Sequence, residues 1–182
     1  MAKKLKLQND VKIFILYLLK NVGKPLYFND LTEVVLADGY VDYMAFAECL
    51  ADLSDTGNVL CTATPDGDLY EITEQGVAVA AELESKIAAY IRTQSLKSAL
   101  RFLSFKERGI RVPVTSTKLD DGRYEMIFEI TEKGAPLFSL SMTVDNSYME
   151  QKMRYNFQND PERIYRAILS VISGDSSFAL KQ

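Results

Sequence analysis

Apolar residues recur at helical spacing in three segments of the first third of the chain. Residues 11–21 (VKIFILYLLKN) are apolar at nearly every position, which predicts a helix buried on more than one side. A second helix is predicted over residues 29–38, capped by Asn29 and stopped at Gly39. A third helix should start at Asp42. Its core positions follow the i, i+3, i+4, i+7 spacing: Phe46, Cys49, Leu50 and Leu53.

The pattern then changes to the period of two that strands show. Residues 59–63 and 69–72 are predicted to be the two strands of a hairpin, with TPDGD as its turn. The hydroxyl of Thr73 can cap the helix that follows, and acidic Glu74 suits a helix N-terminus. This long helix is expected either to break near residues 93–95 or to continue to about residue 106.

Beyond Gly109 the period of two returns. Residues 111–118, 124–131 and 136–144 are predicted strands, and LDDGR and EKGA are predicted turns, so an antiparallel meander is expected.

Two helices are expected to close this half. They should start at Asn146–Ser147 and at Asp160–Pro161. The second should direct one set of apolar side chains inward: Ile164, Ile168, Leu169 and Ile172.

These elements predict an α+β fold with an N-terminal winged helix-turn-helix, a long connecting helix and a C-terminal three-stranded antiparallel meander with two closing helices. Four segments are expected. They are a winged helix-turn-helix domain (1–75), a connecting and dimerisation helix region (76–108), a small α+β domain (109–174) and a flexible tail (175–182).

The order of elements resembles known proteins. ILYLL, LTEVVLADGY, FAECLADLSDTGNVL and YEITEQGVAVAAEL resemble winged-helix regulators of the phenolic-acid-repressor (PadR) type. Over nearly the full length, NDVKIFILYLLKNVGKPL, ERGIRV and PERIYRAIL are similar to two-part winged-helix proteins of anaerobic Gram-positive bacteria, a family known only as a domain of unknown function. This resemblance implies a winged-helix half joined by a helix to a small α+β half, and little about activity.

The amino-acid composition indicates the broad class of protein. Of 182 residues, 47% are hydrophobic and 25% charged, as in soluble globular proteins. There is no apolar run of about 18 residues and no secretory signal, so a cytoplasmic protein with two reduced cysteines, Cys49 and Cys61, is expected.

The chain has no histidine, which removes the common nucleophile systems and the usual zinc and iron ligand sets. Glycine-rich phosphate-binding motifs and the GxSxG nucleophile motif are also absent. We therefore expect no enzyme, no cofactor and no metal site.

Net charge is −4, and it is unevenly distributed. Residues 1–12 carry +3, residues 13–92 carry −9 and residues 93–182 carry +2. An acidic first half behind a basic arm is unfavourable for nucleic-acid binding.

In a helix-turn-helix the third helix enters the major groove of DNA. Its predicted outward face carries Glu48, Asp52 and Asp55 and no basic residue, and the hairpin tip carries two aspartates. The candidate DNA contacts are Lys3, Lys4, Lys6, Lys24, Tyr43, Met44, Ala47 and Glu48. The alternative for the lysine-rich arm is a solvated tail.

Residues 97–123 carry a local charge of +4. A basic stripe is expected at Lys97, Arg101, Lys106, Arg108 and Arg111. It could bind nucleic acid or an acidic partner, form a solvated face, or complement the acidic half within a dimer.

A dimer seam is the remaining candidate site. Its apolar residues are Val77, Ala81, Ile87, Tyr90 and Ile91, which could instead pack on their own domain. The aromatic residues of the C-terminal half are expected mainly in its core, with a small-molecule pocket as the alternative.

The sequence therefore predicts a homodimeric winged-helix transcriptional regulator that binds DNA, with no membrane partner and an unknown effector. The alternative is a winged-helix module that binds proteins and has no DNA contacts.

Overall fold

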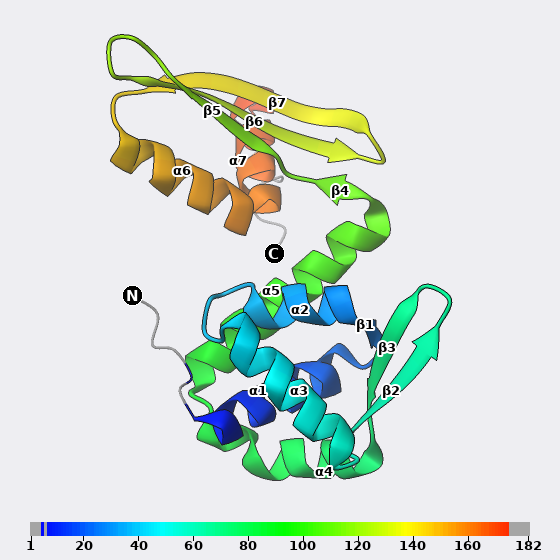
Figure 1. Ribbon diagram of the computed structural model, residues 1–182. Helices are drawn as coiled ribbons and strands as arrows, with labels where there is room; N and C mark the ends of the chain where they lie inside the picture. Colours follow the sequence, from blue (N-terminus) through cyan, green and yellow to red (C-terminus); the bar gives the residue numbers. More distant parts are fainter. Residues whose placement is uncertain (1–4, 6, 175–182) are drawn as a thin grey trace. The chain divides into compact units, whose positions relative to one another are not determined.

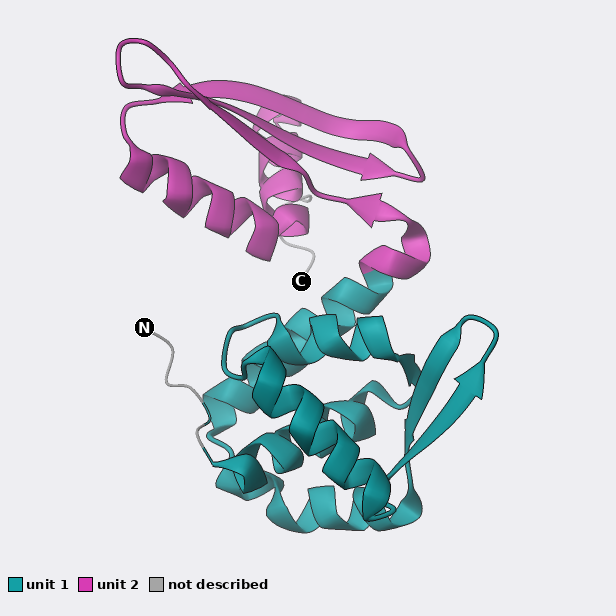
Figure 2. Cartoon of the chain, in the orientation of Figure 1, with its two compact units in different colours: residues 1–104 teal, residues 105–182 magenta. Residues whose placement is uncertain are grey.

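The computed structural model describes residue 5 and residues 7–174, and it divides the chain into two compact units (Figure 2). Unit 1 comprises residues 1–104 and unit 2 residues 105–182. Both combine helices with an antiparallel sheet, so the predicted α+β class is confirmed. The expected connecting region, 76–108, is not a separate body, because most of it lies within unit 1.

Unit 1 begins with three helices (Figure 1): α1 (Gln8–Val22), α2 (Phe28–Leu36) and α3 (Tyr43–Asp55). Helix α1 is buried at every position from Val11 to Leu19 except Lys12, which confirms the prediction of a helix surrounded by core. The Asp42 carboxylate caps α3 by accepting from the Ala45 N–H at 3.0 Å.

A three-stranded sheet follows in the order β1-β3-β2. Strands β2 (Val59–Thr64) and β3 (Gly67–Ile72) form the predicted hairpin. The two-residue strand β1 (Leu26–Tyr27), which the sequence analysis missed, pairs with β3. Since Tyr27 is then the last extended residue, α2 starts at Phe28 and the expected cap by Asn29 is wrong.

The long helix after Thr73 is interrupted earlier than expected. Helix α4 (Glu74–Leu83) is followed by the 3-10 turn η1 (Glu84–Lys86) and then by α5 (Ala89–Arg108). Ile87 is extended and only 1% exposed, so the break in the helix allows this side chain to pack in the core. The Arg92 Nε donates to the Ile87 carbonyl at 3.1 Å and Lys20 pairs with Glu84 at 2.7 Å, and both contacts stabilise the break.

Unit 2 contains one antiparallel sheet. Strand β6 (Tyr124–Glu132) pairs on one side with β4 (Ile110–Arg111) and β5 (Val114–Lys118), and on the other with β7 (Ala135–Val144). The predicted meander is thus present, with its first strand divided at residues 112–113.

Helices α6 (Ser147–Asn159) and α7 (Pro161–Ser173) follow the sheet (Figure 1). The core between sheet and helices contains Met126, Phe128, Ile130, Val144 and Phe157. On α7, Ile164 and Tyr165 pack against this core.

The second half of α7 differs from expectation. Ile168 and Leu169 are half-buried and Ile172 is 79% exposed, because the core of unit 2 contacts only the first half of this helix.

Candidate functional site

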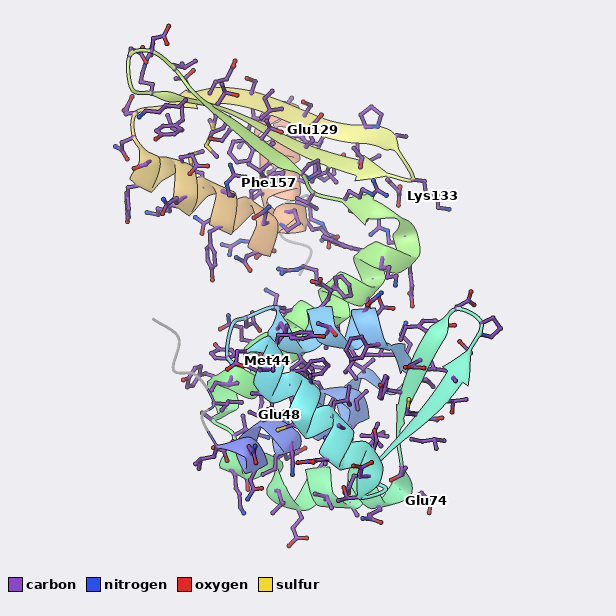
Figure 3. The ribbon with its side chains drawn as sticks, viewed as in Figure 1. Met44, Glu48, Glu74, Glu129, Lys133 and Phe157 are labelled. Carbon is purple, nitrogen blue, oxygen red and sulfur yellow. The ribbon has the colours of Figure 1, made fainter. Side chains whose placement is uncertain are left out.

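The outward face of α3 combines exposed apolar and acidic side chains. Phe46, Cys49, Leu50 and Leu53 are buried, as predicted, and this orients the rest of the helix. The accessible face carries Tyr43, Met44, Ala47, Glu48, Ala51 and Asp55. Met44, at 65% exposure, and Glu48 lie one turn apart on it (Figure 3). The face offers apolar area and carboxylates, but no cation.

The β2–β3 hairpin continues this character. Its tip contains Pro65, Asp66 and Asp68, all exposed, and Leu60 on β2 is 55% exposed. No lysine or arginine occurs between residues 25 and 85, a segment with 13 acidic side chains that forms α2, α3, the hairpin and α4. We call the outward face of α3 together with the hairpin tip the acidic surface.

Only one described contact brings a cation to α3. Lys12 of α1 pairs with Asp52 at 2.9 Å, so one lysine of the predicted basic arm already neutralises an acidic residue of α3. Asp52 therefore contributes less negative charge than Glu48 and Asp55, which have no ion pair among the described residues.

The described structure brings together only those candidate DNA contacts that belong to α3. Lys3, Lys4 and Lys6 lie outside the described residues. Lys24 is exposed at the end of α1, beyond the C-cap glycine. Of the candidates on α3, Tyr43, Met44 and Glu48 are exposed and Ala47 is half-buried.

The predicted basic stripe is divided between the units. Lys97 and Arg101 belong to unit 1, whereas Lys106, Arg108 and Arg111 belong to unit 2. Arg108 also pairs with Glu132 at 3.3 Å.

The predicted dimer seam is divided too. Ile87 and Ile91 are 1% and 3% exposed in the core of unit 1, so neither lies on a surface that a second chain could contact. Val77, Ala81 and Tyr90 remain exposed. The physical reason is the break at residues 84–88: Ile87 is extended within it, α5 starts only at Ala89, and both Ile87 and Ile91 are buried in the core.

Unit 2 contains a cavity of about 310 Å³, large enough for a small molecule. Six of its lining side chains are apolar: Phe105, Ile110, Ile130, Leu137, Pro161 and Leu169. The Tyr165 ring also lines it and packs edge-on against Phe138 at 5.8 Å. Charged residues at the cavity are paired, Arg166 with Glu162 at 2.7 Å and Arg108 with Glu132. The arrangement suits a mainly apolar compound.

The sequence raised a small-molecule pocket in this half only as an alternative, without assigning its lining. Tyr165 and Leu169 are spaced as neighbours on one face of α7, which is a usable signal. Phe105, Ile110 and Leu137 come from three other elements that only folding brings together.

Neither cysteine has the setting of a reactive thiol. Cys49 is buried, and burial raises the pKa of its thiol above the ordinary value. Cys61 is exposed on β2 and lies opposite Tyr70. Burial and a hydrogen bond with Cys61 raise the pKa of Tyr70 to about 12. Among the described residues, no group of three or more potential ligands could hold a metal ion.

The two units define a two-part α+β protein. Comparison with known families gives a match, and this match extends over both units. A family described as Domain of unknown function (DUF4364) matches residues 11–172. The chain belongs to this family. That confirms the expected membership of a family of unknown function, and the match itself carries no likeness to PadR-type regulators. Comparisons with curated proteins and with solved structures gave no match. No helix in the described part of the chain is long and apolar enough to cross a membrane.

Proposed function

We propose that residues 8–72 form a winged helix-turn-helix whose acidic surface binds a basic segment of a partner protein. The order of three helices and a hairpin supports the winged helix, as does the sheet order β1-β3-β2. Because winged helices serve several functions, we infer the function of this one from the chemistry of its surface.

The observation that carries the proposal is the absence of any lysine or arginine between residues 25 and 85. Two like charges about 4 Å apart repel by ~1 kcal/mol in water and by ~4 kcal/mol near a protein surface. Placing Glu48, Asp55 and the hairpin aspartates against phosphates would add several such repulsions. Against arginine and lysine side chains the same groups are attractive.

The apolar part of the surface supports a protein partner as well. Tyr43, Met44 and Leu60 are at least 50% exposed and lie on the elements that carry the carboxylates. Protein interfaces are enriched in tyrosine and methionine, and charged groups around them provide orientation and speed of association.

Binding of a fluorescent arginine-rich peptide to the full chain tests the proposal. We expect salt-sensitive binding that the double substitution Glu48→Lys/Asp55→Lys weakens roughly tenfold or more, because two attractions become repulsions. Glu82→Lys is the control, since Glu82 is an exposed carboxylate of α4 and is not part of the acidic surface. Equal affinities of the double variant and the control would refute the assignment to the acidic surface.

A DNA-binding transcriptional regulator is the second candidate. The helix–hairpin order favours it, and so does the lysine-rich start of the chain. Under this reading the DNA contacts would come mainly from lysines before residue 25, with Tyr43 and Met44 at the groove.

A further inference from the structure

The two edges of the unit 2 sheet are built differently. The β4–β5 edge is interrupted by Pro113, carries Arg111 and Lys118, and has the Val114 carbonyl bound by the guanidinium of Arg154 at 2.6 Å. Proline, charged side chains and covering groups are the features that prevent a sheet edge from pairing with another chain.

The opposite edge has almost none of these features. Strand β7 is ten residues long and contains no charged side chain, and among the described residues it pairs with β6 alone (Figure 1). Pro136 and a register shift affect only its start. Among the described residues, no strand pairs with the outer side of β7 from Leu137 to Val144, and Leu137 and Met142 are 44% and 36% exposed.

Charges at the two ends of β7 indicate which strand would fit there. Lys133 lies in the turn before β7 (Figure 3), and Asp145 follows its last residue. Among the described residues, neither forms an ion pair. When two copies of β7 pair antiparallel, the start of each lies beside the end of the other. Lys133 of each copy then lies near Asp145 of the other copy, which gives two ion pairs. Parallel pairing would instead place Lys133 beside Lys133 and Asp145 beside Asp145.

We propose that the chain forms a homodimer in which β7 pairs antiparallel with β7 of a second copy, joining the two sheets. Such an interface is self-complementary about a two-fold axis, so the same uncharged strand forms both sides of the interface. The pairing provides hydrogen-bond partners for the outer backbone groups and covers part of Leu137 and Met142.

The test is the molar mass of the full chain by size exclusion with light scattering under reducing conditions. We expect twice the chain mass of 20.5 kDa for the wild type. Ser139→Lys should give the monomer, because Ser139 is exposed near the middle of β7 and the introduced lysines of two copies would lie close together. Thr115→Lys on β5 and Thr62→Lys on β2 add the same charge to other edge strands and should remain dimeric.

A charge exchange tests the antiparallel arrangement without altering the strand. Lys133→Glu and Asp145→Lys should each raise the dimer dissociation constant roughly tenfold, and the double substitution should restore it, because two exposed ion pairs are exchanged for two others. A monomeric wild type, a dimeric Ser139→Lys variant that remains folded by circular dichroism, or a double variant no better than the single ones would overturn the proposal.

Discussion

Gly76 fixes the entry of α4 against the loop that follows α3. The Thr73 hydroxyl accepts from the Gly76 N–H at 3.1 Å and donates to the Gly57 carbonyl at 2.8 Å. A Cβ atom at residue 76 would lie 2.2 Å from the Asn58 carbonyl oxygen and 2.8 Å from Cγ1 of Ile72. A single hydrogen atom as side chain is therefore a packing requirement at this position.

Gly76→Ala should lower the free energy of unfolding. Relieving the contact with the Asn58 backbone should cost about 1–3 kcal/mol, against a gain of about 1 kcal/mol in helix propensity. Urea denaturation measures the difference. Ala78→Ser, at an exposed position of the same helix, should change stability by about 0.5 kcal/mol or less. A Gly76→Ala variant as stable as this control would show that the loop after α3 moves aside freely.

At the scale of elements, one arginine of α6 links this helix to the sheet of unit 2. Arg154 donates to the Glu150 carboxylate at 2.7 Å and to the Val114 carbonyl of β5 at 2.6 Å. Glu150 is only 9% exposed, so its carboxylate depends on this partner. On α7, Arg166 and Glu162 form a pair with the same spacing and the same 2.7 Å distance, but Glu162 is exposed.

The two pairs should therefore differ in energy. Arg154→Met should destabilise the chain by about 1–3 kcal/mol, because a half-buried carbonyl acceptor and a buried carboxylate lose their donor. Arg166→Met should cost about 0.3–0.5 kcal/mol, as exposed helix pairs do. Thermal or urea unfolding of both variants measures the contrast, and equal costs would mean that Arg154 does not hold α6 to β5.

The elements with local chemical signals could be predicted from the sequence. Asp42, Thr73 and Asn146 cap their helices as expected, because a short polar side chain before an apolar run is a local signal. The hairpin strands and the meander also followed from their period of two.

Elements that depend on distant contacts could not be predicted. Strand β1 is two residues long and exists because it pairs with β3. The break at residues 84–88 has no glycine or proline to mark it, and it depends on the burial of Ile87 and on the Lys20–Glu84 ion pair. The composition of the acidic surface was visible in the sequence, whereas the cavity needed side chains from several elements.

For the whole molecule, the distribution of charge favours the proposed protein partner over DNA. The elements that would face DNA in a winged helix carry no cation, and Lys12 of α1 is bound to Asp52 of α3. A protein partner with basic residues satisfies the same surface without repulsion. We therefore propose that unit 1 recognises protein through a winged-helix arrangement.

The most direct measurement is binding of the wild-type chain to random duplex DNA across a salt series. Each phosphate neutralised contributes about −0.9 to the slope of log affinity against log salt, so a regulator held by its lysines would show a slope of several units. We predict no binding down to about 50 mM salt, where such contacts are strongest. Binding with a slope of several units would contradict the account and establish phosphate contacts as the function of this fold.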